Sequence, residues 1–181
     1  MLKINFVPDP VLTSEAKPVI KIDKKIQRLA SEMAVILSRQ RNPEGVGLAA
    51  PQVGLPLRLF IIKTKKNAPT ETFINPEIIA SVKNKTPTPE DAADSDQSAE
   101  KLEGCLSIPR IWGHVKRDYK IKVSYTNIDS QKITQWFTGF KALVIQHEVD
   151  HLNGILFTRR AVEQRAKLFK EVDGELVDYQ I

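Results

Sequence analysis

The pentapeptide His147-Glu148-Val149-Asp150-His151 lies inside an apolar stretch, residues 142–152, and constrains the fold more than any other feature of the chain. Two histidines four residues apart lie one above the other on an α-helix, so both imidazoles can reach one metal ion. Glu148 follows the first histidine by about 100° around the helix, where its carboxylate can hold a water molecule. This HExxH pattern predicts a central helix and metal-assisted attack of water on a carbonyl. For these five residues alone, a buried histidine pair with a structural glutamate is the alternative.

Length and composition indicate one globular domain. A chain of 181 residues can bury a sizeable core, and 41% hydrophobic with 27% charged residues is ordinary for a soluble protein. No apolar run approaches the roughly 20 residues of a membrane span, and residues 1–6 lack the apolar segment of a signal peptide. The only cysteine, Cys105, excludes an internal disulfide and favours a reducing compartment. We therefore expect a single catalytic domain over residues 1–181, monomeric, in the cytoplasm and without membrane contact.

The charge is unevenly distributed along the chain. Residues 86–100 contain five acidic and no basic residues, so the rest of the chain has 27 basic and 17 acidic residues. A basic body can attract a polyanion such as ribosomal RNA, which makes the ribosome a candidate partner. No nucleic-acid motif accompanies the charge, so binding to a specific nucleic acid is not expected, and a solvated basic surface is an equal alternative. Residues 84–100 are rich in Pro, Ser, Thr and acids, which predicts a mobile acidic loop insertion.

An apolar stripe in the first part of the chain predicts an amphipathic helix over residues 23–41. The stripe recurs every three or four residues and consists of Ile22, Ile26, Leu29, Met33 and Leu37. Asp23 can cap the start of the helix, and Asn42-Pro43 ends it. Short strands are predicted at residues 58–63, 73–74, 77–83, 119–125 and 132–138, the last two paired through a turn at Asp129-Ser130.

The second half of the chain completes the expected fold. The HExxH helix is predicted over residues 139–152, closed by Asn153-Gly154 in a left-handed conformation. A basic amphipathic segment, residues 160–171, is followed by a turn at 173–175 and a final edge strand at 176–181. Strands dominate between two main helices without a strand–helix–strand rhythm. The predicted class is therefore α+β, with short antiparallel or mixed sheets packed around a central HExxH helix.

A second segment, residues 103–109 (EGCLSIP), offers a third metal ligand. It places the only thiol of the chain in a turn marked by Gly104, directly after the acidic loop. A thiolate is a strong, soft donor, and one cysteine with two histidines leaves a fourth position for water, as a catalytic site requires. The backbone N–H of Leu106, next after Cys105, is expected to point into the site. A lone cysteine is otherwise most often a small buried hydrophobe.

A third segment, residues 45–54 (GVGLAAPQVG), is rich in small residues. It has neither the GxGxxG spacing nor the following Lys-Ser/Thr of a phosphate-binding loop, so a nucleotide is not predicted. Its small side chains instead permit a close approach to the backbone, and Gln52 offers an amide N–H to an oxyanion. A plain tight turn with a surface glutamine is the alternative for this segment alone.

Taken together, the three segments resemble the peptide deformylase family. Its signatures GxGxAAxQ, EGCxS and HExxH occur complete and in order, at residues 45–52, 103–107 and 147–151, and the likeness extends to residues 8–12, 73–76 and 146–154. The resemblance implies a peptide deformylase-like fold. It also implies that Cys105, His147 and His151 bind one divalent metal ion, Fe²⁺ first, with Zn²⁺, Ni²⁺ or Co²⁺ as alternatives. The implied reaction removes the formyl group from N-formylmethionine at the start of a nascent bacterial or organellar polypeptide and releases formate.

The resemblance also implies a role for the other residues of the three segments. Glu148 accepts the proton of the attacking water and delivers it to the leaving amine. The Gln52 side chain and the Leu106 backbone N–H stabilise the oxyanion. Leu143 and Val144 lie one helical turn before His147 and can border an apolar pocket suited to methionine, although ordinary core packing would explain them as well.

The substrate backbone is expected to run along Val46-Gly47 and Gly104 like an added strand, with Glu103 bordering the same site. A buried ion pair between Asp150 and Arg117 is predicted to support the metal-binding helix. The basic segment at residues 160–170 is the candidate contact for a ribosome.

Two other classes of function compete with this interpretation. An HExxH zinc peptidase acting on unformylated peptides would take its third ligand from downstream, where Glu163, Glu171 and Glu175 are available, but it leaves the cysteine motif unexplained. A metal-stabilised binding module has little need for Glu148 or Gln52.

Overall fold

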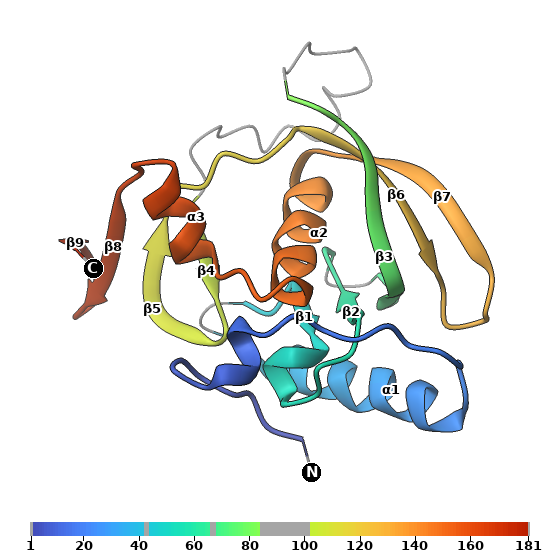
Figure 1. Ribbon diagram of the computed structural model, residues 1–181. Coiled ribbons are helices and arrows are strands. Elements are labelled where there is room, and N and C mark those ends of the chain that lie inside the picture. Colours follow the sequence, from blue (N-terminus) through green and yellow to red (C-terminus); the bar gives the residue numbers. More distant parts are fainter. Residues whose placement is uncertain (1, 42–43, 66–67, 84–101, 181) are drawn as a thin grey trace.

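The computed structural model describes residues 2–41, 44–65, 68–83 and 102–180. Within these residues three α-helices and two antiparallel sheets form an α+β fold, which confirms the expected class. One sheet has the strand order β1-β2-β3-β6-β7 and the other β4-β5-β8-β9, and α2 lies between them (Figure 1). The helices are α1 (Lys24–Arg39), α2 (Gly139–Leu152) and α3 (Phe157–Glu163). The strands are β1 (Gly47–Ala49), β2 (Leu59–Ile62), β3 (Glu71–Val82), β4 (Glu103–Cys105), β5 (Ile108–Gly113), β6 (Lys120–Thr126), β7 (Lys132–Thr138), β8 (Leu168–Val172) and β9 (Glu175–Tyr179).

The five-stranded sheet packs one face against α2 and part of the other against α1. On the α2 side, the inward residues of β6 join a core that contains Phe60, Phe73 and Ile145. The Phe73 ring stacks on Phe60 and on Tyr125, with ring centroids 4.7 and 4.2 Å apart. Helix α2 buries apolar residues such as Ile145 and Val149 together with the polar residues Glu148, Asp150 and His151, so side chains of both kinds lie between the two layers.

Helix α1 covers the opposite face of the sheet at β1 and β2. Met33 and Leu37 of the predicted apolar stripe are buried against Leu48 and Ile61. Asp23 caps the helix as predicted, accepting hydrogen bonds from the backbone N–H groups of Lys25 and Ile26. The predicted terminator, residues 42–43, lies outside the described residues.

The two strand segments predicted on either side of Asn75-Pro76 form one strand, β3. Its register against β6 shifts between Ile74 and Glu77, so Pro76 lies where the ladder does not use its missing N–H. Asn75 adopts φ +50° and binds the backbone N–H and carbonyl of Val19 through its side-chain amide, at 2.8 Å each. The predicted 132–138 hairpin with β6 is confirmed, with Ser130 at φ +66° in its turn.

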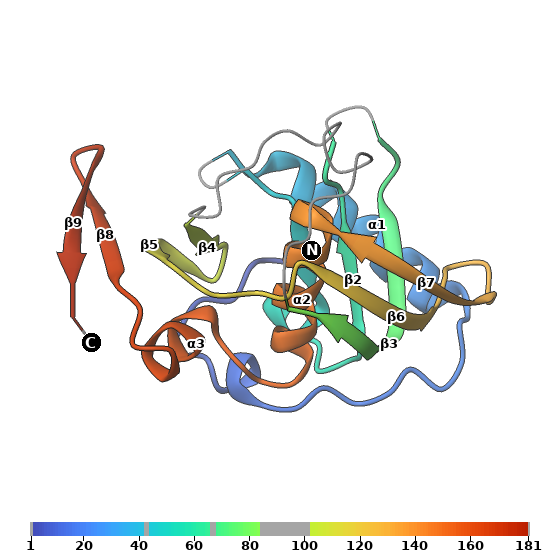
Figure 2. The ribbon, with the colours of Figure 1, turned by 90° about the horizontal axis from the view of Figure 1, so that it is seen from above.

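The second sheet was not predicted as a unit. The basic segment 160–171 divides into the end of α3 and the start of β8, and β8 pairs with β5. The turn at residues 173–175 and the final edge strand are confirmed as the β8–β9 hairpin, which projects beside β5 in Figure 2. The predicted acidic loop, residues 84–100, lies outside the described residues, and residue 181 does as well. No helix in the described part of the chain has the length and apolar character needed to cross a membrane.

Gly154 ends the HExxH helix in the left-handed conformation that was predicted, at φ +66°. A Cβ added there would lie 2.6 Å from the backbone oxygen of Thr13, whereas at Gly174, with φ +86°, it would meet open space. We expect Gly154→Ala to lower the free energy of unfolding by about 2–4 kcal/mol, because backbone strain and a rigid clash add. Gly174→Ala, which adds strain alone, should cost about 1 kcal/mol. Urea unfolding of both variants measures the difference, and equal losses would contradict the packing of α2 on the N-terminal segment.

Candidate metal centre and cleft

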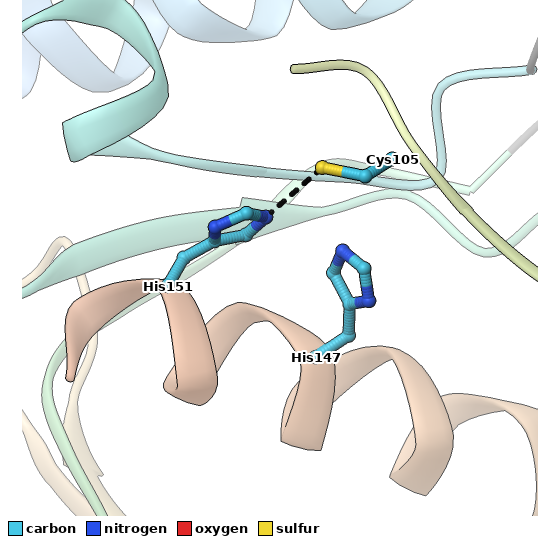
Figure 3. Close-up of side chains that lie close together, drawn as sticks. All are labelled: Cys105, His147 and His151. Carbon is cyan, nitrogen blue, oxygen red and sulfur yellow. Dashed lines mark hydrogen bonds between the residues drawn. The ribbon is translucent and has the colours of Figure 1, made fainter. Parts of the chain in front are cut away.

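The three predicted metal ligands come together at one point of the molecule. Cys105 ends β4, and His147 and His151 lie one turn apart on α2 (Figure 3). One candidate donor atom from each of the three residues lies within 4.8 Å of the other two. The Cys105 Sγ is 3.2 Å from Nε2 of His151. The helical spacing of the histidines therefore brings both rings to the thiol, as the pattern predicted.

The surroundings of the two rings suit a cation. Nδ1 of His147 is hydrogen-bonded to Oε2 of Glu103 at 2.9 Å, which leaves Nε2 for a metal ion. Burial alone would lower the pKa of His147, but hydrogen bonds and charge interactions with Cys105 and Glu103 raise it well above its usual value. Burial lowers the pKa of His151 and keeps its ring in the neutral form that binds metals. A thiol, two imidazoles and a preference for positive charge fit a divalent transition metal.

A buried network of charges connects the ligand strand to the histidine helix. Arg117 donates to both carboxylate oxygens of Glu103, at 2.8 and 2.9 Å, and to Asp150 at 2.5 Å. The predicted pair between Asp150 and Arg117 is thereby confirmed. Arg160 of α3 donates to the second Asp150 oxygen at 2.7 Å, which the sequence did not indicate. Burial alone would raise the pKa of Glu103, but hydrogen bonds from Arg117 and His147 outweigh it and lower the pKa to about 2. Glu103 therefore stays ionised beside His147.

Glu148 lines the cleft together with two of the metal ligands, Cys105 and His147. Its side chain is buried, and Oε2 has no hydrogen-bond partner among the described residues. Burial raises its pKa to about 7. The carboxylate lies so close to Gly47 that a Cβ at that position would overlap it. The position of Glu148 thus requires a glycine at residue 47, the second glycine of the GxGxAAxQ segment.

Gln52 is oriented by two contacts. Its Oε1 accepts a hydrogen bond from the Ala49 N–H at 2.9 Å, so its amino group points the other way. That group is 3.5 Å from Cys105 Sγ and 3.2 Å from Ser107 Oγ. The predicted donor therefore lies at the metal centre, and the alternative of a plain turn with a surface glutamine is wrong, because Gln52 is buried.

A cleft of about 370 Å³ opens over the metal centre. Its lining contains every predicted catalytic and substrate-binding residue, together with two of the ligands: Val46, Gly47, Gln52, Glu103, Gly104, Cys105, Leu106, Leu143, Val144, His147 and Glu148. His151 is not part of the lining and lies deeper, at 1% exposure.

Four lining residues were missed: Glu44, Leu102, Trp112 and Phe140. Phe140 precedes Leu143 by one helical turn, so helical spacing could have found it. Trp112 pairs with Gly104 across the β4–β5 ladder, and a Cβ on Gly104 would lie 2.7 Å from its ring. A glycine opposite a tryptophan is recognisable only once that pairing is known.

A thiol and two histidines beside a buried glutamate, at the base of a cleft, define a metal-dependent hydrolase. The family model described as Polypeptide deformylase matches residues 1–167. The peptide deformylase of Desulfotalea psychrophila is 34% identical over 175 residues, or 94% of each chain. That of Thermotoga neapolitana is 36% identical over 171 residues, or 94% of this chain and 93% of the relative. The chain belongs to the polypeptide deformylase family.

Solved structures agree with this assignment. The crystal structure of a Synechococcus elongatus peptide deformylase in complex with actinonin has a TM-score of 0.75 at 33% identity, covering 88% of this chain and 79% of that one. The Thermotoga maritima peptide deformylase has a TM-score of 0.72 at 36% identity, covering 88% and 97%. The expected family and fold are confirmed, and nothing in these comparisons supports the peptidase alternative.

Arg117 provides a test of the buried network. Arg117→Met removes the positive charge that pairs with the buried carboxylates of Glu103 and Asp150. The free energy of unfolding should therefore fall by about 3–5 kcal/mol. Arg28→Met removes an exposed pair with Glu32 on α1 and should cost less than about 1 kcal/mol. Urea unfolding of the two variants compares a buried with an exposed Arg–Glu pair, and a small loss for Arg117→Met would show that the network contributes little.

Proposed function

We propose that this cleft hydrolyses the formyl amide of N-formylmethionyl nascent polypeptides, releasing formate and a free amino terminus. The observation that carries the proposal is Glu148, a buried carboxyl group that lines the cleft together with the ligands Cys105 and His147 and has one oxygen without a partner among the described residues. Water must lose a proton during attack, and the leaving amine must gain one. A carboxyl group with a pKa of about 7 can do both near neutral pH. Family membership supports the same reaction.

Cys105, His147 and His151 would hold the metal ion. When bound, a divalent ion supplies Lewis acidity toward water and the formyl carbonyl. Fe²⁺ is the proposed ion, with Zn²⁺, Ni²⁺ or Co²⁺ as alternatives that the same ligands accept. Glu103 orients the His147 ring from the other side, and Arg117 keeps that carboxylate in place.

Gln52 and Leu106 are the proposed oxyanion donors. The Ala49 contact fixes the Gln52 amide with its amino group toward the centre, so it needs no reorientation during the reaction. Leu106 follows Cys105 and lines the same cleft. A preorganised donor of this kind contributes about 3 kcal/mol to transition-state stabilisation in acyl transfer.

The two sheets offer a path for the substrate backbone. β1 is the edge strand of one sheet and β4 of the other, and Val46, Gly47 and Gly104 line the cleft between them. An extended peptide could therefore form backbone hydrogen bonds on both sides. Leu143 and Val144 of α2 would contact the methionine side chain of the substrate. Trp112 and Phe140 would contact the substrate residues that follow the methionine. The cytoplasmic location, the monomeric state and a ribosome contact at residues 160–170 stay predictions.

Formate release tests the function and the role of Glu148 together. We expect formate from a formyl-Met tripeptide and no cleavage of the same peptide without the formyl group. Glu148→Gln should lower kcat by at least about 100-fold, because the proton acceptor is lost, while metal content is retained. Glu163→Gln, on the surface of α3, is the matched control and should keep full activity. Cleavage of the unformylated peptide would instead indicate a peptidase, and an active Glu148→Gln would refute the proposed base.

Metal replacement tests the ligand set. Chelation should abolish formate release, and Fe²⁺ added under argon should restore it. A thiolate-bound ferrous ion oxidises readily, so the Fe²⁺-loaded protein should lose activity in air while the Zn²⁺-loaded protein keeps its level. Cys105→Ala should bind less than one equivalent of either metal under conditions that saturate the natural protein. Full metal content in Cys105→Ala would exclude the thiol as a ligand.

A further inference from the structure

One region of the five-stranded sheet is left open by both large helices. On β6, Ile121, Val123 and Tyr125 point into the core that contains α2. The alternate residues of β6 point to the opposite face, the one that α1 covers at β1 and β2. Strands β6 and β7 form the end of the sheet farthest from β1 (Figure 1). There this face carries polar and charged side chains with one large aromatic residue, Trp136.

These side chains form what we call the lysine–tryptophan face: Lys120, Lys122, Lys132 and Trp136. Lys122 pairs directly with Trp136 across the β6–β7 ladder, and Lys120 pairs with Thr138. The Lys120 and Lys122 Nζ atoms lie 5.2 and 5.9 Å from the centre of the Trp136 ring. Neither strand contains an acidic residue. Trp136 is nevertheless 44% exposed, so the lysines do not cover it.

We propose that the lysine–tryptophan face binds single-stranded RNA, with a base stacked on Trp136 and phosphates neutralised by the three lysines. Exposed aromatic rings on an open sheet, interleaved with basic side chains, are the arrangement by which proteins bind single-stranded nucleic acid without reading its sequence. Cation–π contact keeps two ammonium groups beside the ring, where the phosphates of a stacked nucleotide would lie. The net charge of +5 adds long-range attraction for a polyanion.

The composition of the face argues against a lipid surface. Its remaining members on β6 and β7 are small and polar: Ser124, Thr126, Thr134 and Thr138. Strand β3 adds Ala80 and Val82 beside Lys122 and Lys120, and Glu77 beside Ser124. One tryptophan with a valine and an alanine, among small polar residues and a glutamate, offers too little apolar area for insertion into a bilayer. The face also lies on the opposite side of the sheet from α2, so bound RNA would leave the cleft free. The proposal therefore stands independently of the proposed hydrolysis.

Fluorescence anisotropy with a labelled single-stranded RNA of about 12 nucleotides tests the proposal at several salt concentrations. We expect Trp136→Ala to weaken binding by about 5- to 100-fold and Trp136→Phe, which retains a stacking ring, by much less. The double variant Lys120→Gln/Lys122→Gln should make the slope of log affinity against log salt shallower by about 1.4, since each lost phosphate contact contributes about 0.7. Lys24→Gln/Lys25→Gln on α1 removes the same charge from another exposed surface and should leave the slope near that of the natural protein.

Inorganic polyphosphate and anionic phospholipid vesicles serve as competitors without bases. Weak competition by both, together with the Trp136→Ala loss, supports a base-stacking site. The proposal fails if the natural protein does not bind the RNA saturably, or if the control lysine pair matters as much as Lys120 and Lys122. It fails equally if polyphosphate or vesicles displace RNA as well as unlabelled RNA does. Thermal unfolding of each variant verifies the fold. If Trp136→Ala does not fold, the RNA affinity of Trp136→Phe and the salt dependence of the two lysine double variants test the proposal.

Discussion

The candidate site depends on the buried charge network centred on Arg117. The cysteine lies on an edge strand of one sheet and the histidines on a helix that packs against the other. Among the residues that the structure describes, no strand pairing joins the two sheets. Arg117 connects the two parts by binding Glu103, two residues before the thiol, and Asp150, one residue before the second histidine. Removing these three charged groups from water is costly, and only the close pairing of opposite charges offsets that cost. The network therefore fixes where β4 can lie relative to α2 and leaves few alternative positions for the thiol.

The same network also sets the electrostatics of the ligands. Glu103 accepts hydrogen bonds from Arg117 on one side and contacts His147 on the other, so its negative charge is held next to the ring. His147 is thereby oriented with one nitrogen toward the thiol. The next residue is Glu148, whose Oε2 atom has no hydrogen-bond partner among the described residues, and burial raises its pKa. Two glutamates that line the same cleft thus differ in pKa, because Glu103 is paired with arginine and Glu148 is not.

Elements with a local periodic pattern were predicted from the sequence. Elements that form only because a distant strand pairs with them were not. The 139–152 helix and the β6–β7 hairpin have continuous periodic patterns. The helix occurs at the predicted residues, and the hairpin strands lie within one residue of their predicted bounds. The two histidine ligands were predicted from helical spacing and Cys105 from its turn and the family resemblance, and the structure brings the three together. Strand β4 has only three residues, which is too few for a periodic pattern, and it exists because β5 pairs with it.

The segment 160–171 divides at Arg165, which has a φ of +54°. The conformational preferences of arginine do not predict this angle. Trp112 was missed for the same reason as β4, because its place in the cleft depends on the strand opposite.

The basic residues on β6 and β7 show what the position of a charge adds to the overall composition. The excess of basic residues outside the acidic segment was evident from the sequence, but a sum of charges cannot separate a solvated surface from a binding surface. The alternation that predicted β6 as a half-buried strand also assigns Lys120 and Lys122 to the face away from α2. Pairing with β7 then sets Trp136 beside Lys122. A tryptophan that could be buried is instead exposed among like charges, which repel one another unless an anion lies between them. The charges of this face therefore favour an anionic ligand, and the exposed ring favours one that carries a flat aromatic group.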